Sequence, residues 1–205
     1  MKKTLWQPLV LGVVFGLLAG IAMSSGLSFM ISGSEASNAV GFYLALFLLS
    51  AALGGPLAGA ITSTICVFVV AWFGPVDMKE ILSDPVTLWS NVLVTGILLA
   101  LVGFAYRLIF ERVKMPARLL PWAGIVIIYY VFQSPILISL QFFISGGVDL
   151  LSNILSSYQT YIPQAIFDIC FTSLVFIALP ARYRRPLWYE STKTSESAGS
   201  VIPKE

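Results

Sequence analysis

The stretch Val40–Phe73, VGFYLALFLLSAALGGPLAGAITSTICVFVVAWF, decides how the rest of the chain is interpreted. It contains no charged residue, and as one continuous helix it would extend about 51 Å, far beyond a hydrocarbon core about 30 Å thick. Gly54-Gly55-Pro56 interrupts it with two flexible residues and one that lacks a backbone donor. We therefore expect either two short antiparallel spans or a partly re-entrant pair, whose irregular backbone must be shielded by neighbouring helices or face water.

The composition of the whole chain is that of a membrane protein. Its 205 residues are 58% hydrophobic and 11% charged, with a mean hydropathy of +0.89, whereas soluble domains carry about 25% charged and roughly 45–50% apolar residues. We predict an all-α integral membrane protein with six transmembrane helices, two of them short around the Gly-Gly-Pro break, in residues 1–187. Residues 188–205 form a polar cytoplasmic tail that we expect to be disordered. The apolar segments are Leu9–Met30, Val40–Leu53, Leu57–Phe73, Leu88–Phe110, Leu120–Ile144 and Tyr161–Leu179.

The basic residues predict how the chain crosses the membrane. With six crossings and the N-terminus inside, eleven of the twelve Lys and Arg residues fall on the cytoplasmic side, and only Lys79 lies outside. Five crossings with the same C-terminal orientation would leave Lys2 and Lys3 outside. We therefore predict a multi-pass protein of the cell membrane with both termini cytoplasmic and with external loops at 32–39, 74–87 and 145–160. The cytoplasmic residues Arg107, Arg112, Lys114 and Arg118 are expected to set the topology or to contact anionic membrane lipid, with subunit docking as a secondary possibility.

Several classes of function are excluded by what the sequence lacks. It has no histidine, which rules out a Ser-His triad, a His-ligated metal and a His proton relay. Cys66 and Cys170 each lie in an apolar run, where we expect small hydrophobic side chains rather than a disulfide or metal site. There is no phosphate-binding Gly-Lys loop and no nucleophile with an evident base, and a net charge of +2 without a basic stripe argues against nucleic acid. We expect neither an enzyme nor a cofactor.

Small residues line one face of the first apolar segment. Gly12, Gly16 and Gly20 follow each other at four-residue spacing, with Ala19 and Ala22 beside them. Such a face lets another helix approach closely. It therefore predicts either tight packing inside this protein or a docking surface for another membrane subunit, and the spacing does not separate the two.

The sixth segment carries Asp168, the only ionisable residue well inside a span. An ionisable side chain in hydrocarbon normally faces the bundle interior or a cavity. Asp168 belongs to a polar stripe of Tyr161, Gln164, Asp168 and Thr172, and the fifth segment has Tyr130, Gln133, Ser134 and Gln141 at comparable spacing. If the two stripes face each other, they form a pocket for a small organic ligand. Hydrogen bonds that merely hold the bundle together, or an ion or proton pathway, are the alternatives.

Two residues of the fourth segment complete the candidate ligand site. Asn91 lies one turn inside the helix and offers both a donor and an acceptor. Trp89 stands at the external mouth, where it lines an entrance or belongs to the interfacial aromatic belt. The candidate ligand contacts are Asp168, Gln164, Tyr161, Tyr130, Gln133, Asn91 and Trp89.

Taken together, the glycine-rich first helix, the short second helix and the run Gly55-Pro56-Leu57-Ala58-Gly59-Ala60 resemble the substrate-binding S-components of energy-coupling-factor (ECF) transporters. The resemblance implies a six-helix subunit that binds a vitamin or metal ion from outside and works with a membrane-embedded coupling subunit and two ATPases. It also implies that the small-residue face at Ala19 and Ala22 contacts the coupling subunit. The absence of histidine and of a carboxylate cluster disfavours nickel or cobalt.

A second resemblance involves residues 40–61, where Gly41, the Gly-Gly-Pro break and Gly59 are similar to the multi-helix membrane sensor region of autolysin-type histidine kinases. A scaffold or accessory subunit of a larger membrane complex is a third class. Our hypothesis is a transporter subunit that captures a small, vitamin-like organic nutrient and depends on partner subunits for energy. A freestanding sensor module and an accessory subunit are the alternatives.

Overall fold

The computed structural model describes residues 2–26, 28–31, 38–145, 149–180, 183–184 and 187, so the predicted tail at 188–205 lies outside the described residues. The elements are α1 (Lys2–Ser24), β1 (Ser28–Ile31), β2 (Asn38–Gly41), α2 (Phe42–Phe73), α3 (Val76–Ser83), α4 (Pro85–Arg112), α5 (Leu119–Ser145) and α6 (Leu150–Ala178). Within the described residues, α1, α2, α4, α5 and α6 are long and apolar enough to cross a membrane, which confirms a helical membrane protein.

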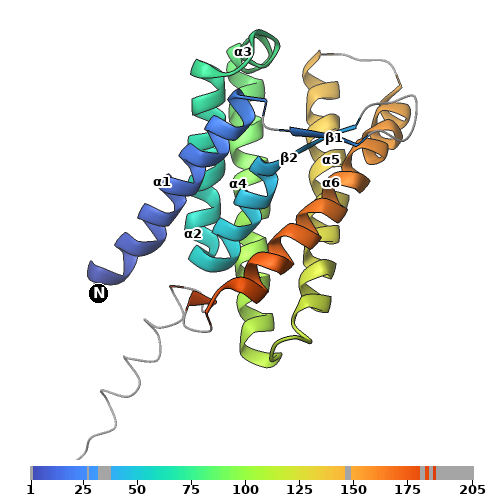
Figure 1. The fold of residues 1–205 in the computed structure, drawn as a ribbon. Helices are drawn as coiled ribbons and strands as arrows, with labels where there is room; N and C mark the ends of the chain where they lie inside the picture. The colour runs from blue at the N-terminus through green and yellow to red at the C-terminus, as the bar shows by residue number, and fades with distance from the viewer. Residues whose placement is uncertain are drawn as a thin grey trace, which may run out of the picture.

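The bundle has two distinct ends (Figure 1). The short helix α3 lies at one, which we call the α3 end, and the connection between α4 and α5 at residues 113–118 lies at the other, which we call the turn end. The strands β1 and β2 pair antiparallel, with Ser28 opposite Gly41, so β2 leads directly into α2.

The predicted break in α2 is confirmed at Gly55. This residue has φ 79° and ψ −170°, a backbone conformation that side chains disfavour, and Pro56 then starts the second segment without needing a donor. Ser50 Oγ and Thr62 Oγ1 lie 2.5 Å apart, although twelve residues along a straight helix would separate them by about 18 Å. Residues 42–54 and 56–73 therefore form a helical hairpin. Whether each segment crosses the membrane stays a prediction.

The glycine face of α1 packs against the second segment of α2. A Cβ added to Gly16 would lie 2.8 Å from Ile65 Cβ, and one added to Gly20 would lie 2.6 Å from Val69 Cβ. Thr62 Oγ1 also donates to the carbonyl of Gly12 over 3.1 Å. Ala19 and Ala22, on the same face, are buried as well. The small residues thus serve close packing within the chain, while apolar side chains on the opposite face of α1 are exposed.

Three connections differ from the sequence prediction. The first helix ends at Ser24 rather than at residue 30, because Gly26 (φ 65°) turns the chain and β1 follows. The expected loop 74–87 contains α3 and the start of α4. The sixth helix begins at Leu150, so most of the expected loop 145–160 is helical. Its 29 residues extend about 43 Å, longer than the hydrocarbon core.

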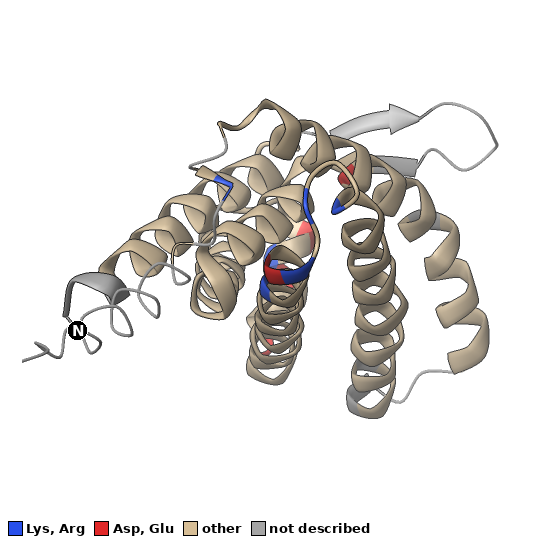
Figure 2. Ribbon diagram, turned by 90° about the horizontal axis from the view of Figure 1, so that it is seen from below, with Lys and Arg blue, Asp and Glu red and all other residues tan. Residues whose placement is uncertain are grey.

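Aromatic packing fills the turn end of the bundle. The rings of Tyr106, Trp122 and Phe176 are almost fully buried, with centroids 5.2 to 5.3 Å apart. At the same end, the Arg118 guanidinium lies 4.0 Å from the ring centre of Phe110 and donates to the carbonyl of Val113 over 2.9 Å. Figure 2, which views the bundle from this end, shows charged residues gathered at the connection between α4 and α5. Large side chains therefore fill the turn end of the bundle.

Candidate functional site

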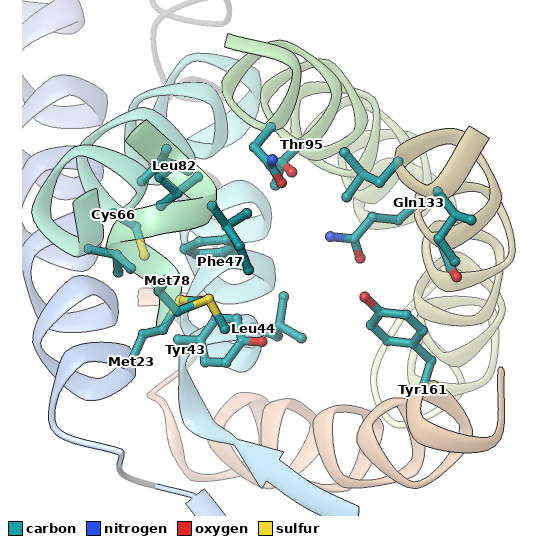
Figure 3. A pocket seen from close by; sticks show the side chains of 17 residues that line it. Met23, Tyr43, Leu44, Phe47, Cys66, Met78, Leu82, Thr95, Gln133 and Tyr161 are labelled. Carbon is teal, nitrogen blue, oxygen red and sulfur yellow. The ribbon is translucent and has the colours of Figure 1, made fainter. Parts of the chain in front are cut away.

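A cavity of about 310 Å³ lies between the helices at the α3 end (Figure 3). Its volume falls at the lower end of the range of roughly 300–1,000 Å³ that is typical of small-molecule sites. All six helices contribute to its wall, so the cavity depends on the assembled bundle. The lining residues are Met23, Tyr43, Leu44, Phe47, Cys66, Val67, Val70, Met78, Ile81, Leu82, Asn91, Thr95, Gln133, Ser134, Leu137, Ile138 and Tyr161.

Gln133 on α5 is the most informative polar side chain in this wall. It is only 6% exposed, and its amide points into the cavity (Figure 3). Its Oε1 atom is buried and has no hydrogen-bond partner among the described residues. Native proteins pair nearly all buried polar atoms, and an unpaired acceptor costs about 1–3 kcal/mol. The unpaired oxygen therefore marks a position where a donor from another molecule would fit.

Most of the polar side chains gather on one part of the wall, apart from Tyr43 of α2, whose hydroxyl lies beside Leu44. The Tyr161 hydroxyl points into the same space as Gln133 (Figure 3). Thr95 on α4 is 5% exposed and belongs to the same wall. Asn91, one turn before Thr95, donates through Nδ2 to the carbonyl of Thr87 over 2.9 Å, which holds its side chain beside the cavity. The cavity thus presents amide and hydroxyl groups along α4, α5 and α6.

The opposite part of the wall is apolar. Cys66, Met78 and Leu82 face Gln133 and Tyr161 across the open space (Figure 3). Met23 from α1 and Phe47 from α2 extend this surface. Methionine has a flexible, polarizable side chain that adapts to the shape of what it contacts. Together the two sides form a cavity with one hydrogen-bonding wall and one adaptable apolar wall.

Helix α3 covers the cavity at its end of the bundle. Its residues Met78, Ile81 and Leu82 line the cavity, while Asp77 and Glu80 are exposed and do not line it. The next helix, α4, begins at Pro85 with Asp84 as its N-cap, whose carboxylate accepts from the Thr87 backbone over 2.8 Å and from the Thr87 hydroxyl over 2.7 Å. These hydrogen bonds from Thr87 hold the pKa of Asp84 below its usual value.

Asp168 lies in a hydrogen-bonded network and is not among the residues that line the cavity. It is fully buried, and its carboxyl group accepts from the Tyr130 hydroxyl and, over 2.9 Å, from Gln164 Nε2. One turn further along α6, Thr172 donates to the Asp168 carbonyl over 2.5 Å and accepts from Trp122 Nε1 over 2.8 Å. The polar stripe on α6 is therefore hydrogen-bonded to α5. This is the arrangement expected if the stripe holds the bundle together.

Gln164 extends this network to the strand β2. Its Oε1 accepts from the Gly41 amide over 2.7 Å, and its Nε2 donates to the Gly41 carbonyl over 2.8 Å. One side-chain amide thus pairs with both backbone groups of one residue. Since Gly41 directly precedes α2, this contact fixes where the first segment of α2, with the cavity residues Tyr43 and Phe47, begins.

No family model, curated protein or solved structure matches this chain. The chemistry of the cavity therefore rests on its own residues. Among the described residues, no three His, Cys, Asp or Glu side chains gather in a way that could hold a metal ion. The groups that the wall supplies are amides, hydroxyls, one thiol and apolar side chains.

The candidate ligand contacts predicted from the sequence divide into three groups. Asn91, Gln133 and Tyr161 line the cavity. Tyr130, Gln164 and Asp168 form the buried network instead. Trp89 is 52% exposed and packs edge-on against Phe68, with centroids 6.0 Å apart, on the outside of the bundle.

Sequence reasoning did not identify Tyr43, Thr95, Met23 and Met78 as cavity residues. Thr95 had a usable signal, because it follows Asn91 by four residues and so shares its helix face. The two methionines had none, since their place at the cavity depends on how α1 and α3 pack against the rest of the bundle.

Proposed function

We propose that this chain is the membrane-embedded substrate-binding subunit of a transporter, which captures a small, vitamin-like organic molecule from outside the cell. The cavity at the α3 end, with the unpaired acceptor of Gln133 facing open volume, carries the proposal. A bundle that needed only to hold itself together would gain from an apolar side chain at this position. A binding subunit, by contrast, needs a polar atom that stays unpaired until its substrate arrives.

The charge distribution supports a cavity that faces outward. At the turn end, α4 and the following connection carry Arg107, Arg112, Lys114 and Arg118, as expected for a cytoplasmic side. At the α3 end, acidic residues surround the single basic residue Lys79. In this proposal the chain crosses the cell membrane six times with both termini cytoplasmic, and the hairpin in α2 supplies the two short crossings.

Energy would come from partner subunits. The sequence has no phosphate-binding Gly-Lys loop, so ATP hydrolysis is assigned to separate ATPases that act through a membrane-embedded coupling subunit. The resemblance to S-components of ECF transporters supports the same arrangement.

Purification of the tagged chain from its native membrane in a mild detergent tests this proposal. We expect a membrane subunit and an ATPase to be recovered with it in fixed proportion, and ATP-driven accumulation of a small organic solute by vesicles that contain all three. Recovery of a histidine kinase, or of a large complex without any ATPase, would instead identify a sensor or an accessory subunit and overturn the transporter proposal.

A further inference from the structure

The described part of the cavity wall carries no charge that could pair with a charged ligand. Among the described residues that line it, none is Asp, Glu, Lys or Arg. The buried carboxyl group of Asp168 lies outside this wall and is already paired with Tyr130 and Gln164. Moving a carboxylate, phosphate or ammonium group from water into such a site is costly unless a counter-charge or several hydrogen bonds compensate it. The wall therefore discriminates against ionised ligands.

The unpaired acceptor of Gln133 specifies what the ligand must bring. Gln133 Oε1 requires an N–H or O–H donor, and the same side-chain amide also carries the two N–H donors of Nε2. An amide satisfies both of its sides at once when its partner has a donor and an acceptor next to each other. Gln164 shows this pairing within the same bundle, since it accepts from and donates to Gly41 over 2.7 and 2.8 Å.

The apolar wall specifies the rest of the ligand. Met23, Cys66 and Met78 present sulfur-containing side chains, and Phe47 and Leu82 add a ring and a branched chain. Thioethers make favourable contacts with aromatic rings and adjust to their outline. A flat apolar ring placed between this surface and Gln133 would contact both walls of the cavity.

From these observations we infer that the cavity selects an uncharged ligand in which a neighbouring donor and acceptor, as in a carboxamide, a lactam or a nitrogen heterocycle, are joined to an apolar ring. The donor pairs with Gln133 Oε1 and the ring packs against the methionine side of the wall. This inference deepens the proposed function and rests on it, because it assigns the substrate class of the same cavity.

Four naphthalene derivatives with the same ring test the inference: naphthalene-2-carboxamide, the methyl ester of naphthalene-2-carboxylic acid, naphthalene-2-carboxylate and naphthalen-2-ylmethylammonium. Their binding to the full chain in lipid nanodiscs is measured by equilibrium dialysis at neutral pH, with empty nanodiscs subtracted. We expect the carboxamide to bind about tenfold or more tightly than the ester, which lacks a donor for Gln133. The carboxylate and the ammonium compound should bind about a hundredfold more weakly than the carboxamide.

The variant Gln133→Met separates the amide contact from general apolar binding. Methionine has nearly the same length but no acceptor, so the carboxamide should bind this variant no more tightly than the ester does. Equal binding of carboxamide and ester to the unchanged chain would overturn the inference, as would tight binding of either charged probe or no binding of any probe. These results do not depend on the variant and hold even if it fails to fold.

The binding result and the transporter proposal can fail separately. If an ATPase is recovered with the chain but a charged probe binds best, the transporter proposal stands and the assigned ligand class is wrong. If the carboxamide binds as expected but no ATPase is recovered, the ligand class stands for a sensor or accessory subunit instead.

Discussion

Replacing Gln133 by methionine is expected to stabilise the unliganded protein. The substitution removes a buried acceptor that has no partner among the described residues, and an unsatisfied buried acceptor costs about 1–3 kcal/mol. Glutamine and methionine have similar helix propensities and similar lengths, so neither helix formation nor packing should oppose the gain. For a chain of this size, 1 kcal/mol corresponds to a shift of about 2–4 °C in the melting temperature.

Gln164→Met provides a matched control with the opposite sign. It is the same chemical change at another buried position, but Gln164 makes three hydrogen bonds, to the Gly41 amide, the Gly41 carbonyl and Asp168 Oδ1, of 2.7, 2.8 and 2.9 Å. Each is worth about 0.5–1.5 kcal/mol, and the groups left unpaired add a further cost. We therefore expect this variant to lose roughly 3 kcal/mol.

Unfolding of both variants can be followed by tryptophan fluorescence during heating and during titration with a denaturing detergent. Trp122 is fully buried and hydrogen-bonded to Thr172, so its emission should report loss of the bundle core. The reasoning fails if Gln133→Met lowers stability about as much as Gln164→Met does. That result would mean that Gln133 holds the bundle together, and its unpaired oxygen would no longer indicate a ligand.

Three further predictions concern packing, pH and topology. Gly16→Leu should destabilise the bundle by about 1–3 kcal/mol, because even an added Cβ would lie 2.8 Å from Ile65 Cβ. Val14→Leu, on the exposed face of α1, should leave the stability unchanged, and titration with a denaturing detergent measures both variants. Because its folded-state pKa is lowered, Asp84 contributes stability that is present above its unfolded value near pH 4 and is lost as the pH falls through the lower folded value. As the pH is lowered below about 4, the melting temperature of the unchanged protein should therefore fall more than that of Asp84→Asn, which keeps a cap but does not titrate. A difference in melting temperature between the two proteins that does not change with pH would refute this. In a chain whose two cysteines are replaced by serine, an impermeant maleimide should label Glu80→Cys on intact cells but Glu111→Cys only after permeabilisation; the reverse pattern would contradict the topology.

The elements that could be predicted are those with a local signal. The hairpin in α2 was predictable because Gly55 and Pro56 together remove both the conformational restraint and the donor that a continuous helix needs. The early start of α6 was not, because residues 150–160 mix leucine with serine, asparagine and glutamine and so resemble a loop in composition. Their helix is amphipathic rather than uniformly apolar, and hydropathy alone underestimates such a segment.

Helix periodicity predicted which residues of the candidate site share a helix face, but nothing more. Spacing correctly puts Tyr161 and Asp168 on one face of α6, but it does not say what that face meets at each level. Near Tyr161 the face meets the cavity, whereas seven residues later, at Asp168, it meets Tyr130 of α5. Since helices cross at an angle, neighbouring turns of one stripe contact different elements, and only the tertiary structure distinguishes a ligand contact from a structural one.

The buried network around Asp168 and the cavity residue Gln133 are separate, but both bear on the same cavity. The network around Asp168 ends on Gln164 and so holds Gly41, the residue from which α2 begins. The cavity residue Tyr43 follows two positions later, so its place depends on that anchor. A wall held rigidly in this way favours selective binding, because less ordering is left for the ligand to impose. The part of the stripe at Gln164 and Asp168, which the sequence suggested as ligand contacts, thus holds one wall of the cavity, while Gln133 on the facing helix is the contact that we propose for the ligand.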